Sequence, residues 1–172
     1  MRVGAINVNP AITLDELLIW HQESSRFWKD FFDANPVLLE LPCDIGRTTN
    51  VMEFLRHIWA VDLVWARRVA GLEDLDREKA PPGPLDLLFG LHVEAVEILR
   101  GALNDASFDW ERRLSLDVSW LPPEKRNPTL RKALAHALTH GPRHWAQLAT
   151  LVRAAGHPSG FKGDLLYSSA LS

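Results

Sequence analysis

Four long stretches of this 172-residue chain repeat apolar residues with the period of an α-helix. The spacing predicts helices over about residues 13–34, 50–70, 84–104 and 127–156, each with one apolar face. Such faces must be buried against one another, so the pattern predicts an all-α four-helix bundle with a long crossover connection before the last helix. Hydrophobic residues make up 47% of the chain, which is enough for one core, and we expect a single domain over residues 1–172.

Polar residues at the helix ends support these boundaries. Thr13 and Glu16 have the spacing of a capping box, in which each side chain bonds the other residue's backbone N–H. Asn50 and Glu53 repeat that spacing at the second helix, and Asn127 precedes a proline that suits the first turn of the fourth. Before the fourth helix, FDWERRLSLDVSW alternates apolar and polar residues, which predicts a short strand pair or an extended crossover.

The fourth stretch, LRKALAHALTHGPRHWAQLATLV, contains His136, His140 and His144. Residues four apart share a helix face, so two imidazoles on adjacent turns can bind one divalent ion. Each step of four residues drifts by about 40°, so we expect His136/His140 or His140/His144 to serve, but not all three. Pro142 lies inside the second pair, and a proline in a helix costs about 3 kcal/mol, which predicts a kink or a distorted turn.

A third candidate ligand, His57, lies in the second stretch, FLRHIWAVDLVW. Three histidines from two helices would leave open positions on a metal, which is typical of a reactive site and not of a closed structural one. Neither four-residue interval contains glutamate, so this is not the zincin motif. The competing interpretation is that all of these are ordinary helix histidines.

Three further residues are candidates to support the site from outside the ligand set. Asp62 could orient a ligand imidazole or form a helix-surface salt bridge. Gln147, one turn after His144, could touch a bound water or be a polar edge residue, and His136 could support a ligand or be a core or surface residue.

The other histidines are predicted to have no direct role. His21 lies on the inward stripe of the first helix and is expected to be buried and hydrogen-bonded, whereas His92 and His157 are expected to face solvent. The chain has seven tryptophans, and the candidates to line a pocket are Trp20, Trp59 and Trp145.

The order of these parts resembles the DinB/YfiT-like superfamily of four-helix-bundle metalloproteins. The matching segments are HIWAVDLVW, HALTHGPRHWAQLATLVRAAG and DLLY. The last helix of that family resembles the pattern H-x-x-x-H-G-x-x-H-x-x-Q-x-x-x-x-x-R-x-x-G, which this chain meets with His136, His140, Gly141, His144, Gln147, Arg153 and Gly156. The resemblance implies that His57, His140 and His144 are the metal ligands. Departures from the family are Pro142, Arg143 where many members have His, and Trp145-Ala146 where many have Arg-Gly.

The resemblance also implies a function. It points to a divalent metal ion, with zinc or nickel ahead of iron, and to a metal-dependent enzyme of the low-molecular-weight thiol S-transferase type, using thiols such as bacillithiol or mycothiol, or of the hydrolase type. No catalytic side chain can be named. One alternative is a non-catalytic, stress-related metal or small-ligand binding protein, and another is a structural or interaction domain without metal. Related folds are frequently dimers, so a homodimer is expected.

Composition excludes several other classes. A net charge of -3 does not indicate the basic surface that nucleic-acid binding requires. The apolar runs are shorter than the roughly 20 residues of a membrane span. The N-terminus lacks the pattern of a signal peptide, which favours a cytoplasmic protein. The expected partner is a small-molecule substrate. Cys43 is the only cysteine, which excludes an intramolecular disulfide and a cysteine-rich zinc knuckle.

Overall fold

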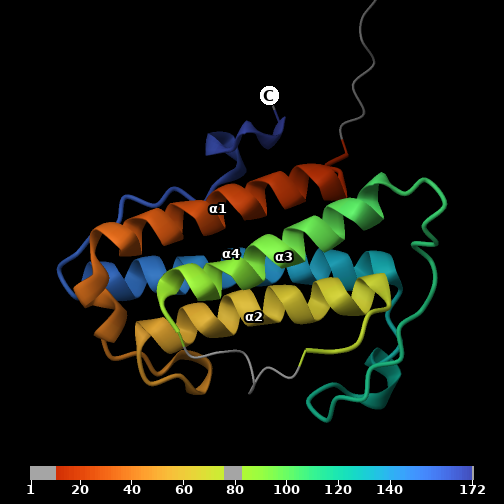
Figure 1. Cartoon of the computed structure of the whole chain (residues 1–172), viewed down its shortest axis with the longest axis horizontal. Coiled ribbons are helices and arrows are strands. Elements are labelled where there is room, and N and C mark those ends of the chain that lie inside the picture. The colour runs from red at the N-terminus through yellow and green to blue at the C-terminus, as the bar shows by residue number, and fades with distance from the viewer. Residues whose placement is uncertain (1–10, 76–82, 172) are drawn as a thin grey trace, which may run out of the picture.

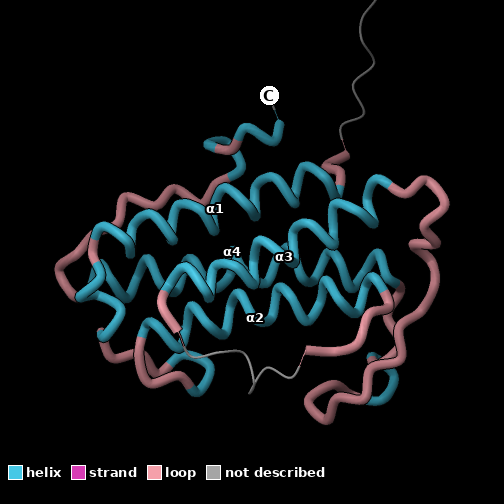
Figure 2. The backbone as a smooth tube through the Cα atoms, viewed as in Figure 1, coloured by secondary structure: helices cyan, strands magenta, loops and turns pink. Residues whose placement is uncertain are grey.

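Four α-helices lie side by side in the computed structural model, which describes residues 11–75 and 83–171 (Figure 1). They are α1 (Leu14–Ala34), α2 (Val51–Ala70), α3 (Leu85–Asn104) and α4 (Leu130–Ala154). The described residues contain no strand beyond isolated bridges, and short 3-10 turns occur in the connections (Figure 2). The all-α four-helix bundle is therefore confirmed, and residues 105–129 form a long extended connection before α4.

The order of packing differs from the order along the chain. Both α1 and α2 pack against α3 and α4, so α1 and α2 occupy opposite corners of the bundle, as do α3 and α4. By their colours in Figure 1, α2 and α3 run in the same direction, and α1 and α4 run the opposite way. The end of α2 and the start of α3 therefore lie at opposite ends of the bundle. This arrangement sets α2 and α4, which carry the candidate ligands, side by side and antiparallel.

The first two helices begin where their capping signals predicted. The backbone N–H of Glu16 donates to Thr13 Oγ1 at 3.2 Å, and that of Thr13 donates to Glu16 Oε2 at 2.7 Å, which completes the capping box. The backbone N–H of Glu53 likewise donates to Asn50 Oδ1 at 2.9 Å, but the Glu53 carboxylate reaches back to Thr49. Both caps satisfy backbone donors that the first turn of a helix leaves unpaired.

The start of α4 was predicted two residues too early. Its cap is Thr129, whose hydroxyl accepts from the backbone N–H of Lys132 at 3.2 Å. The residues before it pair with the preceding segment, because the backbone N–H groups of Leu114 and Leu116 donate to Pro128 and Arg126. That pairing holds Asn127 and Pro128 beside the preceding segment and outside the helix, so Asn127 does not cap it.

A layer of polar side chains divides the core into two apolar parts. One part surrounds Trp28, Trp59 and Trp145, which are all fully buried, and the other surrounds Leu18 and Leu134. On α1, α3 and α4 the residues between these two parts include the buried His21, His92, His140 and His144, and on α2 the buried Asp62 lies just past the boundary. Within the described residues, no helix is both long enough and apolar enough to cross a membrane.

Candidate metal centre

The bundle brings three of the predicted histidines together. His57 projects from α2, and His140 and His144 project from α4, with their donor nitrogens all within 4.8 Å of one another. The Nε2 atoms of His140 and His144 are 3.0 Å apart. The ring centroid of His57 lies 5.5 Å from the ring centroid of His140 and 5.4 Å from that of His144. We call His57, His140 and His144 the three-histidine cluster. Its donor atoms are close enough to share one metal ion.

Helix α4 provides two of these donors because it continues through Pro142. It runs as a single α-helix from Leu130 to Ala154, so His140 and His144 keep their one-turn spacing. His136, one turn earlier, is outside the cluster; its ring packs edge-on against Trp65 at 5.0 Å between centroids. Of the two pairings that the sequence left open, the structure brings His140/His144 together with His57.

A hydrogen bond to Gln147 sets the orientation of one imidazole. Gln147 Oε1 lies 2.6 Å from His144 Nδ1, and a carbonyl oxygen can only accept a hydrogen bond. His144 therefore carries its proton on Nδ1 and turns the lone pair of Nε2 toward the cluster. Gln147 thus contacts the imidazole itself, which is the usual way in which an outer residue fixes a histidine ligand.

Burial keeps these imidazoles neutral. It lowers the pKa of His140 to about 3, with the neighbouring His144 as the second cause. Burial also lowers the pKa of His144, against the opposing effect of its hydrogen bond to Gln147. Neutral imidazole is the form that binds metal, so both side chains are ready to do so near neutral pH.

A cavity of about 410 Å³ opens onto the three-histidine cluster between α2 and α4. We call it the α2–α4 cavity. Its wall includes two aromatic residues that the sequence analysis did not nominate, Trp65 and Trp120. Two nominated tryptophans, Trp59 and Trp145, are buried in the core instead, and the third, Trp20, donates a hydrogen bond to the Gly163 carbonyl. Trp65 lies two turns after His57 on α2, and this spacing could have identified it.

A second cavity, of about 480 Å³, lies on the other side of His57. Its wall includes Arg47, Thr48 and Arg56, and it shares Gly46 and His57 with the α2–α4 cavity. Arg47 has a φ of 71°, a left-handed conformation that is uncommon for residues other than glycine. His57 therefore stands between two cavities, each of which contains arginine.

A second buried group lies nearby in the polar layer. His21 Nε2 and His92 Nδ1 both bond Asp62 Oδ2, at 3.0 and 2.9 Å, and all three residues are 2–3% exposed. We call these residues the Asp62 network; its donor atoms could also hold a metal ion. The prediction for His21 is confirmed, whereas the prediction that His92 faces solvent is wrong. His92 follows Leu88 by four residues and precedes Ala95 by three, so it lies on the buried stripe of α3.

Asp62 does not bond the three-histidine cluster, although it was a candidate to orient a ligand. Burial alone would raise the pKa of its carboxyl, but the charge and hydrogen bond of His21, followed by those of His92, leave this pKa far below the usual range. The network still touches the other site through packing. A Cβ atom at Gly141 would lie 2.6 Å from His21 Cε1, so only glycine fits between the two ligand positions of α4.

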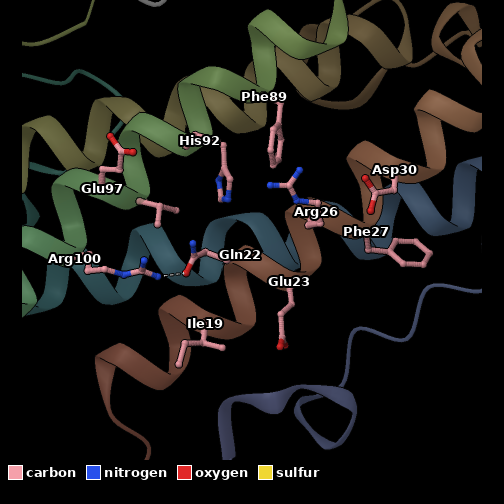
Figure 3. Close-up of a pocket in the computed structure, with 12 residues that line it drawn as sticks. Ile19, Gln22, Glu23, Arg26, Phe27, Asp30, Phe89, His92, Glu97 and Arg100 are labelled. Carbon is pink, nitrogen blue, oxygen red and sulfur yellow. Dashed lines mark hydrogen bonds between the residues drawn. The ribbon is translucent and has the colours of Figure 1, made fainter.

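A groove of about 630 Å³ runs between α1 and α3 (Figure 3). His92 forms part of its floor, and the Arg26 side chain extends toward Phe89 and His92, with its guanidinium 4.7 Å from the Phe89 ring centroid. None of the three clustered histidines lines this groove. It therefore leads to the Asp62 network and not to the three-histidine cluster.

Comparison with known protein families gives one match. The family described as the DinB superfamily matches residues 13–148, a span that contains α1, α2, α3 and all three residues of the three-histidine cluster. A comparison with curated proteins finds no match.

Proposed function

This chain belongs to the DinB superfamily, and from that premise we propose that it is a metal-dependent enzyme whose divalent ion is held by His57, His140 and His144. The proposed ion is zinc or nickel, with iron as the next candidate, and the proposed chemistry is thiol S-transfer or hydrolysis. One observation carries the proposal: three imidazole donors from two helices meet within 4.8 Å at the wall of a cavity.

The residues present suit such an ion. Three neutral imidazole nitrogens are good ligands for zinc, nickel and iron, and three protein ligands leave room for water or substrate. A divalent ion held there is a Lewis acid that lowers the pKa of a bound water or thiol. Gln147 contributes by holding the Nε2 lone pair of His144 toward the cluster.

The cavity supports catalysis over simple metal storage. Its volume of about 410 Å³ is within the usual range for small-molecule sites, roughly 300–1,000 Å³. Trp65 and Trp120 give it an apolar wall against which a substrate can pack. Among the described residues that line it there is no carboxylate to act as a general base, which favours thiol transfer over hydrolysis.

The test is a screen of the metal-loaded protein. Zinc- and nickel-loaded samples would be assayed for thiol consumption with a panel of electrophiles and for hydrolysis of ester and amide substrates. We expect turnover that requires metal and is lost in His144→Ala, while His157→Ala, which alters an exposed histidine outside the site, keeps it. A fully loaded protein that is inactive toward both panels would instead support a non-catalytic metal or small-ligand binding protein.

A further inference from the structure

Two arginines without acidic partners stand beside the three-histidine cluster. Arg143, between His140 and His144 in sequence, places Nη2 3.2 Å from His144 Nε2 and forms no ion pair within the described part of the chain. Arg47, in the wall of the second cavity, also lacks an ion pair there. By contrast, Arg68 in the α2–α4 cavity is paired with Asp74, with Nη2 and Oδ2 2.6 Å apart.

The charges around the cluster leave positive potential unbalanced. Its three imidazoles are neutral as ligands, and none of the described residues lining the α2–α4 cavity is acidic. The buried carboxylate of Asp62 is already bonded to His21 and His92. A divalent ion would add two positive charges to that of Arg143, so the cavity attracts anions and disfavours cations.

Resting on the metal site proposed above, we propose that the substrate of this cavity carries a carboxylate that pairs with the Arg143 guanidinium. The guanidinium is a planar fork of N–H donors that matches a carboxylate in two-point contact. Arg143 is exposed, lies on the same helix as His140 and His144, and lines the α2–α4 cavity together with all three residues of the cluster. A carboxylate bound by Arg143 would therefore lie in the same cavity as the metal.

The experiment compares two ligands that differ in charge and little in shape. Cobalt(II)-loaded protein would be titrated with 3-mercaptopropionate and with 3-mercaptopropionamide, following the thiolate-to-cobalt charge-transfer band. Acetate and acetamide, followed through the visible cobalt bands, supply the same comparison without a thiol. The variants are Arg143→Gln and Arg143→Lys, and the control is Arg131→Gln, which removes an exposed charge from the first turn of α4.

We expect the wild-type protein and Arg131→Gln to bind the carboxylate of each pair about tenfold or more tightly than the amide, the size of a charge-assisted hydrogen bond. Arg143→Gln should lose most of this preference while still binding cobalt, and Arg143→Lys should keep more of it than Arg143→Gln does. Equal binding of acid and amide by the wild-type protein would overturn the inference. A preference that is undiminished in Arg143→Gln would also overturn it, because the metal alone would then select the carboxylate. A protein that takes up no cobalt would refute the proposed metal site itself.

Discussion

At the scale of single residues, buried charge sets the stability of the Asp62 network. The Asp62 carboxylate is fully enclosed and receives both of its hydrogen bonds on one oxygen, Oδ2, from His21 and His92. A buried ion stripped of its partners is costly, so neither the carboxylate nor its donors can be removed without penalty.

Asp62→Asn should therefore lower the free energy of unfolding by about 3 kcal/mol at pH 7. The pKa of Asp62 is depressed in the folded state, so its contribution is complete above the unfolded pKa of about 3.9 and is lost as the pH falls through the folded pKa. Urea unfolding from pH 7 down to pH 3 should show the difference from wild type narrowing below about pH 4. Asp117→Asn, at an exposed position, is the control; a difference independent of pH would contradict this account.

Gln147→Ala should weaken metal binding by about 10–100-fold, because His144 would lose the acceptor that fixes its tautomer. Competition with a chromophoric chelator measures this affinity. Thr150→Ala, at an exposed position further along α4, should bind metal as the wild type does. If the two variants had equal affinity for metal, the hydrogen bond between His144 and Gln147 would have no part in metal binding.

Sequence reasoning at this scale was limited to local spacing. The one-turn spacing of His140 and His144 is visible in the sequence, because only one helix has to be correct. The prediction that His92 faces solvent was wrong because its partner, Asp62, lies on another helix and is not visible in the local spacing. Contacts between helices depend on their relative rotation, which no single stretch of sequence contains.

At the scale of elements, α4 fits against α1 through one glycine. Gly141 leaves space for the His21 ring, whose Cε1 and Nδ1 atoms would lie 2.6 and 2.9 Å from an added Cβ. The contact links the Asp62 network to the segment that carries His140 and His144.

Gly141→Ala should cost about 1–3 kcal/mol of stability, because the added methyl group overpacks this contact. In a His21→Ala background the same change should be neutral, or stabilising by up to about 1 kcal/mol, since alanine favours a helix more than glycine does. A double-mutant cycle on the free energy of unfolding measures the coupling. An equal cost of Gly141→Ala in both backgrounds would show that His21 is not the residue in its way.

Helix boundaries could be predicted where a nearby side chain caps the helix. The prediction failed where backbone groups distant in sequence form hydrogen bonds with the residues before the helix. Thr13 and Asn50 cap α1 and α2 as their spacing indicated. Asn127 had an equally good signal, but its neighbours Arg126 and Pro128 accept hydrogen bonds from Leu116 and Leu114. That pairing joins residues ten or more positions apart and could not be predicted from the capping pattern.

At the scale of the whole molecule, the fold gives the proposed metal site its access. Because α1 and α2 occupy opposite corners, α2 meets α4 along a face that ends at the α2–α4 cavity, while α1 and α3 enclose a separate groove. The number of helices could be predicted from the periodicity of apolar residues in the sequence. Which helices pack against one another could not.

The expected homodimer is a prediction at the same scale. Several large apolar side chains lie exposed near α1 and the chain end, among them Val37, Leu166 and Tyr167. Light scattering over a range of protein concentrations should give twice the chain mass of 19.4 kDa. A mass of one chain at every concentration would contradict it.

The most direct test of the account is metal content. Purified, untagged protein would be analysed for its elements beside His57→Ala and, as a control, His157→Ala. We predict close to one equivalent of a divalent metal in the wild type and in the control, with loss of that metal in His57→Ala, because His57 is the only cluster residue that α2 supplies. Equal metal content in all three proteins, or no metal in any of them after loading and desalting, would show that the three-histidine cluster does not bind it.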